Sequence, residues 1–135
     1  MIELFSRIVA TLAQGQSVVS TTIVTNEGST PRTAGSKMLV FADGSIAGTV
    51  GGGLSEGQVM AAAPDVFRTG QARLIDFDMT GQAAKGADLI CGGRMRVFLE
   101  RLDPDTATRA LFAALVDLLT RGGRGLVVTA LETAG

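Results

Sequence analysis

The sequence predicts a single layered α/β domain in which helices flank a mixed β-sheet. The chain has 135 residues, and 46% of them are hydrophobic, which is enough for one buried core. Apolar residues recur at helical spacing over residues 2–14 and again from residue 104 to about residue 121. Runs rich in β-branched residues lie between these stretches and are typical of strands. Helices and strands that alternate in this way are typical of the α/β class.

The remaining elements follow from local signals. Strands are expected over residues 17–25, 37–42, 45–50, 72–79, 94–101 and 125–131. The Asp43-Gly44 pair favours a hairpin between two of them. A helix is expected over residues 54–69, and Pro64 should kink or split it. Asp103 and Pro104 suit the N-cap and the first position of the last helix.

Composition excludes several classes of function. The chain has no His, which excludes a His general base, a Ser-His-Asp triad and a His-built metal site. A net charge of −1 argues against a nucleic-acid partner. One Cys cannot form an intrachain disulfide and fits a reducing, cytoplasmic setting. No signal peptide and no apolar run of about 20 residues is present, so no membrane association is expected.

The first candidate binding segment reads Gly-Ser-Thr-Pro-Arg and ends at Arg32. Pro31 fixes the backbone, so the hydroxyls of Ser29 and Thr30 and the guanidinium of Arg32 follow in a set order. Arg32 suits a bidentate grip on a phosphate, and Lys37 adds a second cation if its strand returns past the loop. The alternative is an ordinary surface turn with an exposed Arg.

The second candidate is a triple glycine, Gly51, Gly52 and Gly53, between an expected strand and an expected helix. Thr49 precedes it and Glu56 follows it. Free N–H groups at a helix N-terminus favour a phosphate or a carboxylate, although Glu56 could satisfy this helix end itself. The spacing matches neither a P-loop nor the Gly-x-Gly-x-x-Gly pattern. The alternative is a tight turn that binds nothing.

The third candidate is Cys91, followed by Gly92 and Gly93. Glycine N–H groups could stabilise a thiolate, which makes Cys91 a candidate soft metal ligand or sulfur carrier. A small buried apolar Cys is the alternative. Asp76 and Asp78 share one face of an expected strand, and a solvated face is favoured over a cation or acid–base site there.

Taken in order, the motifs resemble those of XdhC/CoxI-type proteins, the accessory maturation factors of molybdenum hydroxylases such as xanthine dehydrogenase and carbon monoxide dehydrogenase. Four motifs carry the resemblance over about residues 2–101: Gly-Ser-Thr-Pro-Arg ending at Arg32, Gly-Ser-Lys-Met-Leu-Val starting at Gly35, Gly-Thr-Val-Gly-Gly-Gly starting at Gly48 with Glu56, and Ile-Cys-Gly-Gly ending at Gly93 with Glu100.

The resemblance implies a chaperone for the molybdenum cofactor, as molybdopterin or its nucleotide form, rather than a catalyst. Such a chaperone protects the cofactor, supports its sulfuration by a cysteine desulfurase and delivers it to the apo-enzyme. The binding residues implied are Ser29, Thr30, Arg32, Lys37, Thr49, Gly51, Gly52, Gly53, Glu56, Gly92 and Gly93. Cys91 would lie near the molybdenum, and no catalytic residue is assigned. Two alternatives stay open: a phosphate- or nucleotide-using transferase with Cys91 as nucleophile, and a pure protein-interaction domain.

Two features bear on how the chain is organised. Many relatives carry a second, Rossmann-like domain that is missing from residues 1–135, so the chain is a fragment, a single-domain paralogue or one partner of a split pair. Residues 122–135 also resemble residues 15–28, at the offset that separates Gly15 from Gly122. An unpaired strand at residues 125–131 would favour a homodimer.

Overall fold

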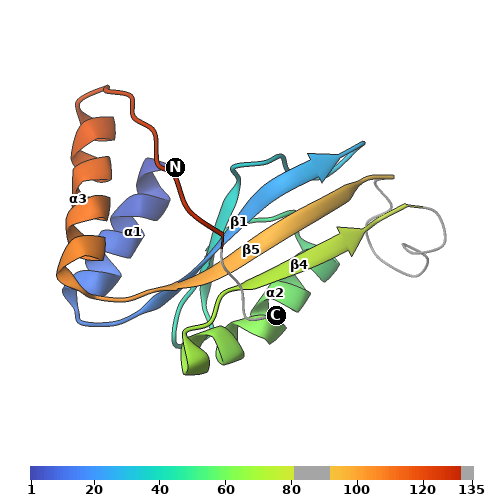
Figure 1. The fold of residues 1–135 in the computed structure, drawn as a ribbon, viewed down its shortest axis with the longest axis horizontal. Coiled ribbons are helices and arrows are strands. Elements are labelled where there is room, and N and C mark those ends of the chain that lie inside the picture. Colours follow the sequence, from blue (N-terminus) through green and yellow to red (C-terminus); the bar gives the residue numbers. More distant parts are fainter. Residues whose placement is uncertain (81–91, 132–135) are drawn as a thin grey trace.

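The computed structural model describes residues 1–80 and 92–131, and it places three helices around one five-stranded sheet (Figure 1). The helices are α1 (Ile2–Ala13), α2 (Gly53–Thr69) and α3 (Thr106–Thr120). The strands are β1 (Val18–Glu27), β2 (Lys37–Val40), β3 (Ile46–Gly48), β4 (Arg73–Asp78) and β5 (Arg94–Leu102). The predicted α/β class with flanking helices is confirmed.

The sheet has the order β3-β2-β1-β5-β4, and all four of these pairings are antiparallel. The expectation of a mixed sheet is therefore wrong in this detail. A short turn at Asp43 and Gly44 joins β2 to β3, and such a connection permits only antiparallel strands. Helix α2 connects β3 to β4 at opposite edges of the sheet, so these strands never pair.

Helix α2 covers one face of the sheet and forms the larger core with it. Successive side chains of a strand point to opposite faces, so alternate residues of β1 and β5 enter this core. Its members include Val19, Ile23, Met38, Val97 and Leu99 from the strands and Val59, Ala63 and Val66 from the helix. This packing fixes the position of the N-terminus of α2 against the sheet.

Helices α1 and α3 lie side by side at one end of the molecule, away from the tips of β4 and β5 (Figure 1). The rings of Phe5 and Phe112 pack between them, with centroids 5.7 Å apart and planes tilted by 56°. A second core forms around Ile8, Leu12 and Leu102. At the opposite end of the sheet, where β1 ends and β5 begins, loops rather than helices follow the strands.

A β-bulge lies in the longest strand pairing. The register between β1 and β5 shifts between Ile23 and Thr25, which leaves Val24 as an extra residue on β1. Pairing nevertheless continues until Glu27 stands opposite Arg94. The loop that leaves β1 and the segment that enters β5 therefore start next to each other.

Two expectations about helices differ from the structure. Pro64 does not split α2, which runs through it as one helix because Val59 and Val66 pack on the sheet on either side of it. The N-cap of α3 is Asp105, whose carboxylate accepts a hydrogen bond from the Thr108 N–H at 2.8 Å. Asp103 is bound instead by the Ser17 hydroxyl and by an arginine of β5.

The expected last strand is also not seen. Residues 125–131 are extended beyond α3 but join no strand of the described sheet. Their β-branched composition predicts a strand, yet a strand forms only where another strand offers its hydrogen-bonding edge. Among the described residues, the only edges of the sheet belong to β3 and β4.

Candidate functional site

Two of the glycine motifs meet where β1 ends and β5 begins. A Cβ built on Gly93 would lie 2.2 Å from the carbonyl oxygen of Ser29 and 2.7 Å from that of Glu27. A Cβ on Gly28 would lie 3.1 Å from the carbonyl oxygen of Gly92. Only glycine allows two backbones to approach this closely, so the two motifs form one packed unit.

The triple glycine joins the same unit through Pro31. A Cβ on Gly51 would lie 2.6 Å from the Cγ of Pro31. Gly51, Gly52 and Gly53 have φ values of +134°, +83° and +51°, a run that side-chain-bearing residues rarely adopt. Three segments that are far apart in the sequence are therefore brought together at one end of the sheet.

The N-terminus of α2 lies in this unit, and no side chain caps it. The first N–H groups of a helix have no partner within the helix, and their partial positive charge favours an anion. A Cβ on Gly52 would meet no atom within 4 Å, so the surface over this position is open. The helix end combines unpaired donors with access, which suits a phosphate or a carboxylate.

Thr49 and Glu56 hold the shape of the triple-glycine loop. The Thr49 hydroxyl accepts a hydrogen bond from the Gly51 N–H at 3.0 Å and donates one to the Glu56 carboxylate. Glu56 is therefore engaged by a side chain and leaves the helix end open. Both residues are half-buried at the rim of the loop.

The loop around Arg32 is closed by its own residues. The Thr30 hydroxyl donates to the Arg32 carbonyl at 2.7 Å, and the Arg32 guanidinium donates to the Pro31 carbonyl at 2.9 Å. The Asn26 side chain accepts the Ala34 N–H at 2.8 Å and ties the loop to the end of β1. Arg32 itself is exposed. Sequence reasoning missed Asn26, although an Asn at the start of a turn is a signal for such a bond.

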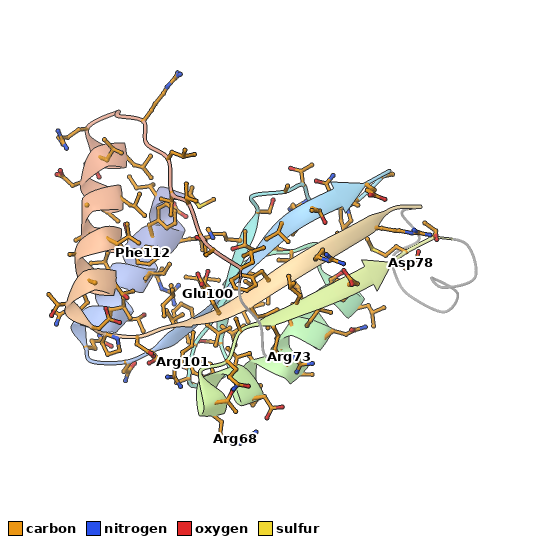
Figure 2. All side chains as sticks on the ribbon, in the orientation of Figure 1. Arg68, Arg73, Asp78, Glu100, Arg101 and Phe112 are labelled. Carbon is orange, nitrogen blue, oxygen red and sulfur yellow. The ribbon has the colours of Figure 1, made fainter. Side chains whose placement is uncertain are left out.

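Lys37 does not join Arg32. Its Nζ donates to the Thr22 hydroxyl at 2.6 Å, on the face of the sheet opposite α2. Lys37 and Glu100 line a groove of about 610 Å³ between this face, α3 and residues 127–131. Figure 2 shows Glu100 on β5 on the side of the helix pair. The sequence did contain a signal for the position of Lys37. Side chains alternate between the two faces along β2, so Met38 points toward α2 and Lys37 points away from it.

Burial perturbs both charged groups of this groove. Desolvation raises the pKa of the Glu100 carboxyl, and the charge of Lys37 partly offsets this rise. Desolvation likewise lowers the pKa of the Lys37 ammonium, and the charge of Glu100 partly offsets this fall. The two groups are half-buried and interact through their charges in a groove lined largely by apolar side chains, apart from the glycine unit.

The remaining candidate site residues are Cys91, Asp76 and Asp78. Cys91 lies outside the described residues. Asp76 pairs with Arg96 at 2.7 Å and Asp78 with Arg94 at 3.6 Å, and both carboxylates are exposed, so the interpretation as a solvated face is confirmed. Figure 2 shows Asp78 at the end of β4. Within residues 1–80 and 92–131, no group of three or more His, Cys, Asp or Glu could hold a metal ion.

Comparisons with known proteins agree with this arrangement. The sequence pattern of the XdhC and CoxI family matches residues 11–78, and the chain belongs to this family. It is 42% identical over 77 residues to the uncharacterized protein YqeB of Escherichia coli (strain K12). It also superposes, at a TM-score of 0.75 and 29% identity, on a crystal structure described as a xanthine dehydrogenase from Bacillus halodurans.

The chain is short beside both of these proteins. The match covers 57% of this chain but 14% of YqeB. The structural match covers 90% of this chain but 35% of the Bacillus halodurans protein. None of the helices described here is long and apolar enough to span a bilayer.

The contact at Gly93 gives a direct test. Gly93→Ala should lower the free energy of unfolding by about 1–3 kcal/mol, because the new methyl group overlaps the Ser29 carbonyl. Gly57→Ala is the matched control, since its methyl would enter open space on α2 and should stabilise the helix by about 0.5–1 kcal/mol. Urea denaturation measures both, and a neutral Gly93→Ala would refute the packed unit.

The groove predicts a pH effect with a defined sign. In an NMR titration, the Glu100 carboxyl should titrate above its ordinary pKa, and Lys37→Met should raise that pKa further by removing an attracting charge. The stability that Glu100 contributes is thus fully present below the ordinary carboxyl pKa and is lost as the pH rises through the raised pKa. Asp105, bound to Thr108, serves as the control that should not move. An unchanged Glu100 midpoint in Lys37→Met would contradict the pairing.

Proposed function

We propose that this chain binds the molybdenum cofactor, as molybdopterin or its nucleotide form, and holds it for delivery to a molybdenum hydroxylase. The observation that carries the proposal is the convergence of three glycine segments at the uncapped N-terminus of α2, beside the Arg32 loop. Membership of the XdhC and CoxI family supports this choice of cargo.

The donors at the glycine unit suit the phosphate end of such a molecule. Backbone N–H groups at the start of α2 would bind the phosphate oxygens, and Arg32 would add a charge-assisted pair. The space beside Gly52 is open, so a ligand can approach the backbone closely at this position. Thr49 and Glu56 would act by fixing the loop, and Glu56 also offers an acceptor for ring N–H groups.

The cation that grips the phosphate is Arg32 in this proposal. Lys37 is bound to Thr22 on the other face of the sheet and therefore takes no part in the phosphate contact. Cys91 directly precedes Gly92 and Gly93, and we assign its thiol to the molybdenum end, as a ligand or in sulfur handling. A cysteine desulfurase would supply the sulfur, and the apo-hydroxylase would receive the loaded cofactor.

The proposal predicts the effect of removing the Arg32 side chain. The purified chain is mixed with molybdenum cofactor under anaerobic conditions, and retention of pterin and molybdenum is measured after gel filtration. Arg32→Ala should weaken binding by roughly tenfold or more, the loss typical of one charge-assisted hydrogen-bonded contact. Arg73→Ala is the matched control, because Arg73 is an exposed arginine at the start of β4, whereas the end of β4 lies beside the glycine unit (Figure 2).

Four outcomes would contradict the proposal in different ways. Equal retention by wild type and Arg32→Ala would refute the phosphate site. Wild-type cofactor binding and sulfuration by Cys91→Ser would refute the role of the thiol. Tight binding of the hydroxylase with no affinity for the cofactor would favour an interaction domain, and turnover of a nucleotide with a Cys91 adduct would favour a transferase.

A further inference from the structure

The groove on the sheet face opposite α2 contains two opposite charges on different strands. Lys37 lies on β2 and Glu100 on β5, and β1 runs between these strands. Neighbouring strands lie about 4.8 Å apart, so the two backbones are separated by roughly 10 Å. Within residues 1–80 and 92–131, no ion pair joins the two side chains. The groove therefore holds an ammonium and a carboxylate that are near each other without direct contact.

Another pair of opposite charges on the same face shows what direct pairing looks like. Asp76 and Arg96 stand opposite each other in the register of β4 and β5, and their side chains meet at 2.7 Å. Both side chains are also exposed, so water satisfies what the pair leaves free. Lys37 and Glu100 are half-buried and lack such a contact. Charges of this kind gain most from a partner that enters the groove.

Free hydrogen-bonding groups gather around these two charges. The Lys37 ammonium has three donors, and the Thr22 hydroxyl accepts one of them at 2.6 Å. Ser20 stands opposite Glu100 in the strand register, is 2% exposed and lines the groove. Among the residues described, neither the Ser20 hydroxyl nor the Glu100 carboxylate has a side-chain hydrogen bond. Buried polar side chains are usually paired, so these free groups suit a bound molecule.

The walls of the groove are largely apolar. Phe98 and Leu102 share a face of β5 with Glu100, and Phe112 and Leu115 line the groove from α3 (Figure 2). The volume of about 610 Å³ falls within the range of small-molecule sites, roughly 300–1,000 Å³. Such sites typically combine apolar walls with a few converging polar groups. The groove therefore has the composition and the size of a site for a small amphipathic molecule.

We infer that this groove binds a free α-amino acid with an apolar side chain. The ligand carboxylate accepts hydrogen bonds from the Lys37 ammonium, and the ligand ammonium donates to the Glu100 carboxylate and the Ser20 hydroxyl. The ligand side chain packs against Phe98 and Phe112. Charge complementarity selects this class, because a simple carboxylate leaves Glu100 without a counter-charge and a simple amine leaves Lys37 without one. The groove lies apart from the glycine unit, and this site does not depend on the cofactor proposal.

The shifted pKa values of the two charged groups support this assignment. Desolvation raises the pKa of Glu100 and lowers the pKa of Lys37, so burial disfavours both charged forms. In the described part of the chain, no other titratable side chain lines the groove. A bound zwitterion places an opposite charge beside each group and compensates both.

The choice of ligand is tested by calorimetric titration of the full 135-residue chain with L-leucine and L-phenylalanine. Three analogues of leucine each lack one feature: isocaproate lacks the ammonium, isoamylamine lacks the carboxylate, and glycine lacks the apolar side chain. We expect each analogue to bind at least tenfold more weakly than L-leucine, because each loses one charge-assisted contact or the burial of the side chain.

Substitution of the two charged groups tests the same site. Lys37→Met and Glu100→Gln should each weaken the binding of L-leucine at least tenfold. Arg96→Met and Asp76→Asn are the matched controls on the exposed pair and should leave binding unchanged. Arg32→Ala should also leave it unchanged, which separates this groove from the proposed cofactor site. Circular dichroism identifies any variant that fails to fold.

Several results would overturn the inference. One is a failure of both L-leucine and L-phenylalanine to bind with a dissociation constant below about 10 mM. Another is binding of isocaproate or isoamylamine as tight as that of L-leucine. Wild-type affinity in folded Lys37→Met or Glu100→Gln would also overturn it. The comparison of ligands uses the wild-type chain alone, so it remains decisive even where a variant does not fold.

Discussion

The backbone contact between Gly93 and residues 27–29 is the constraint on which the site depends. Strands β1 and β5 pair until Glu27 faces Arg94, so the two chain segments beyond that point must share the same space. They can do so because Gly93 lacks a Cβ, which would lie 2.2 Å from the Ser29 carbonyl. The loop held in this way places Pro31 on Gly51, and this second contact carries the constraint to the start of α2. Two glycines thus connect three loops.

The fold separates regions with different chemistry. The glycine unit lies at the end of the sheet where donors are backbone N–H groups and where Arg32 is exposed. Lys37 and Glu100 lie in the groove on the sheet face opposite α2, where burial lowers the pKa of Lys37 and raises the pKa of Glu100. Helices α1 and α3 lie at the opposite end of the molecule (Figure 1). The proposed cofactor site is therefore separate from both the charged groove and the helix pair.

The sequence was most informative where local chemistry decides the structure. The β-branched runs and the triple glycine predicted β1 and the start of α2 correctly, since both follow from backbone preferences. Pro64 does not split α2, because packing on the sheet holds the helix on both sides of it. The cap of α3 was mispredicted because Ser17 and Arg101 bind Asp103, which leaves Asp105 to cap the helix. The separation of Lys37 from Arg32 depends on which face each strand residue takes, and residues 125–131 join no strand of the described sheet because a strand also needs a partner edge. A local sequence pattern does not show which strands pair or which face of the sheet a residue occupies.

One titration tests most directly whether the three glycine loops form a single anion site. The ¹⁵N-labelled chain is titrated with inorganic phosphate and followed through its amide resonances. We predict that the amides of Ser29, Thr30, Arg32 and residues 52–55 and 92–93 shift together with one dissociation constant, and that Gly93→Ala abolishes the common response. Shifts confined to one loop, shifts with different dissociation constants, or shifts centred on Lys37 and Glu100 would contradict it.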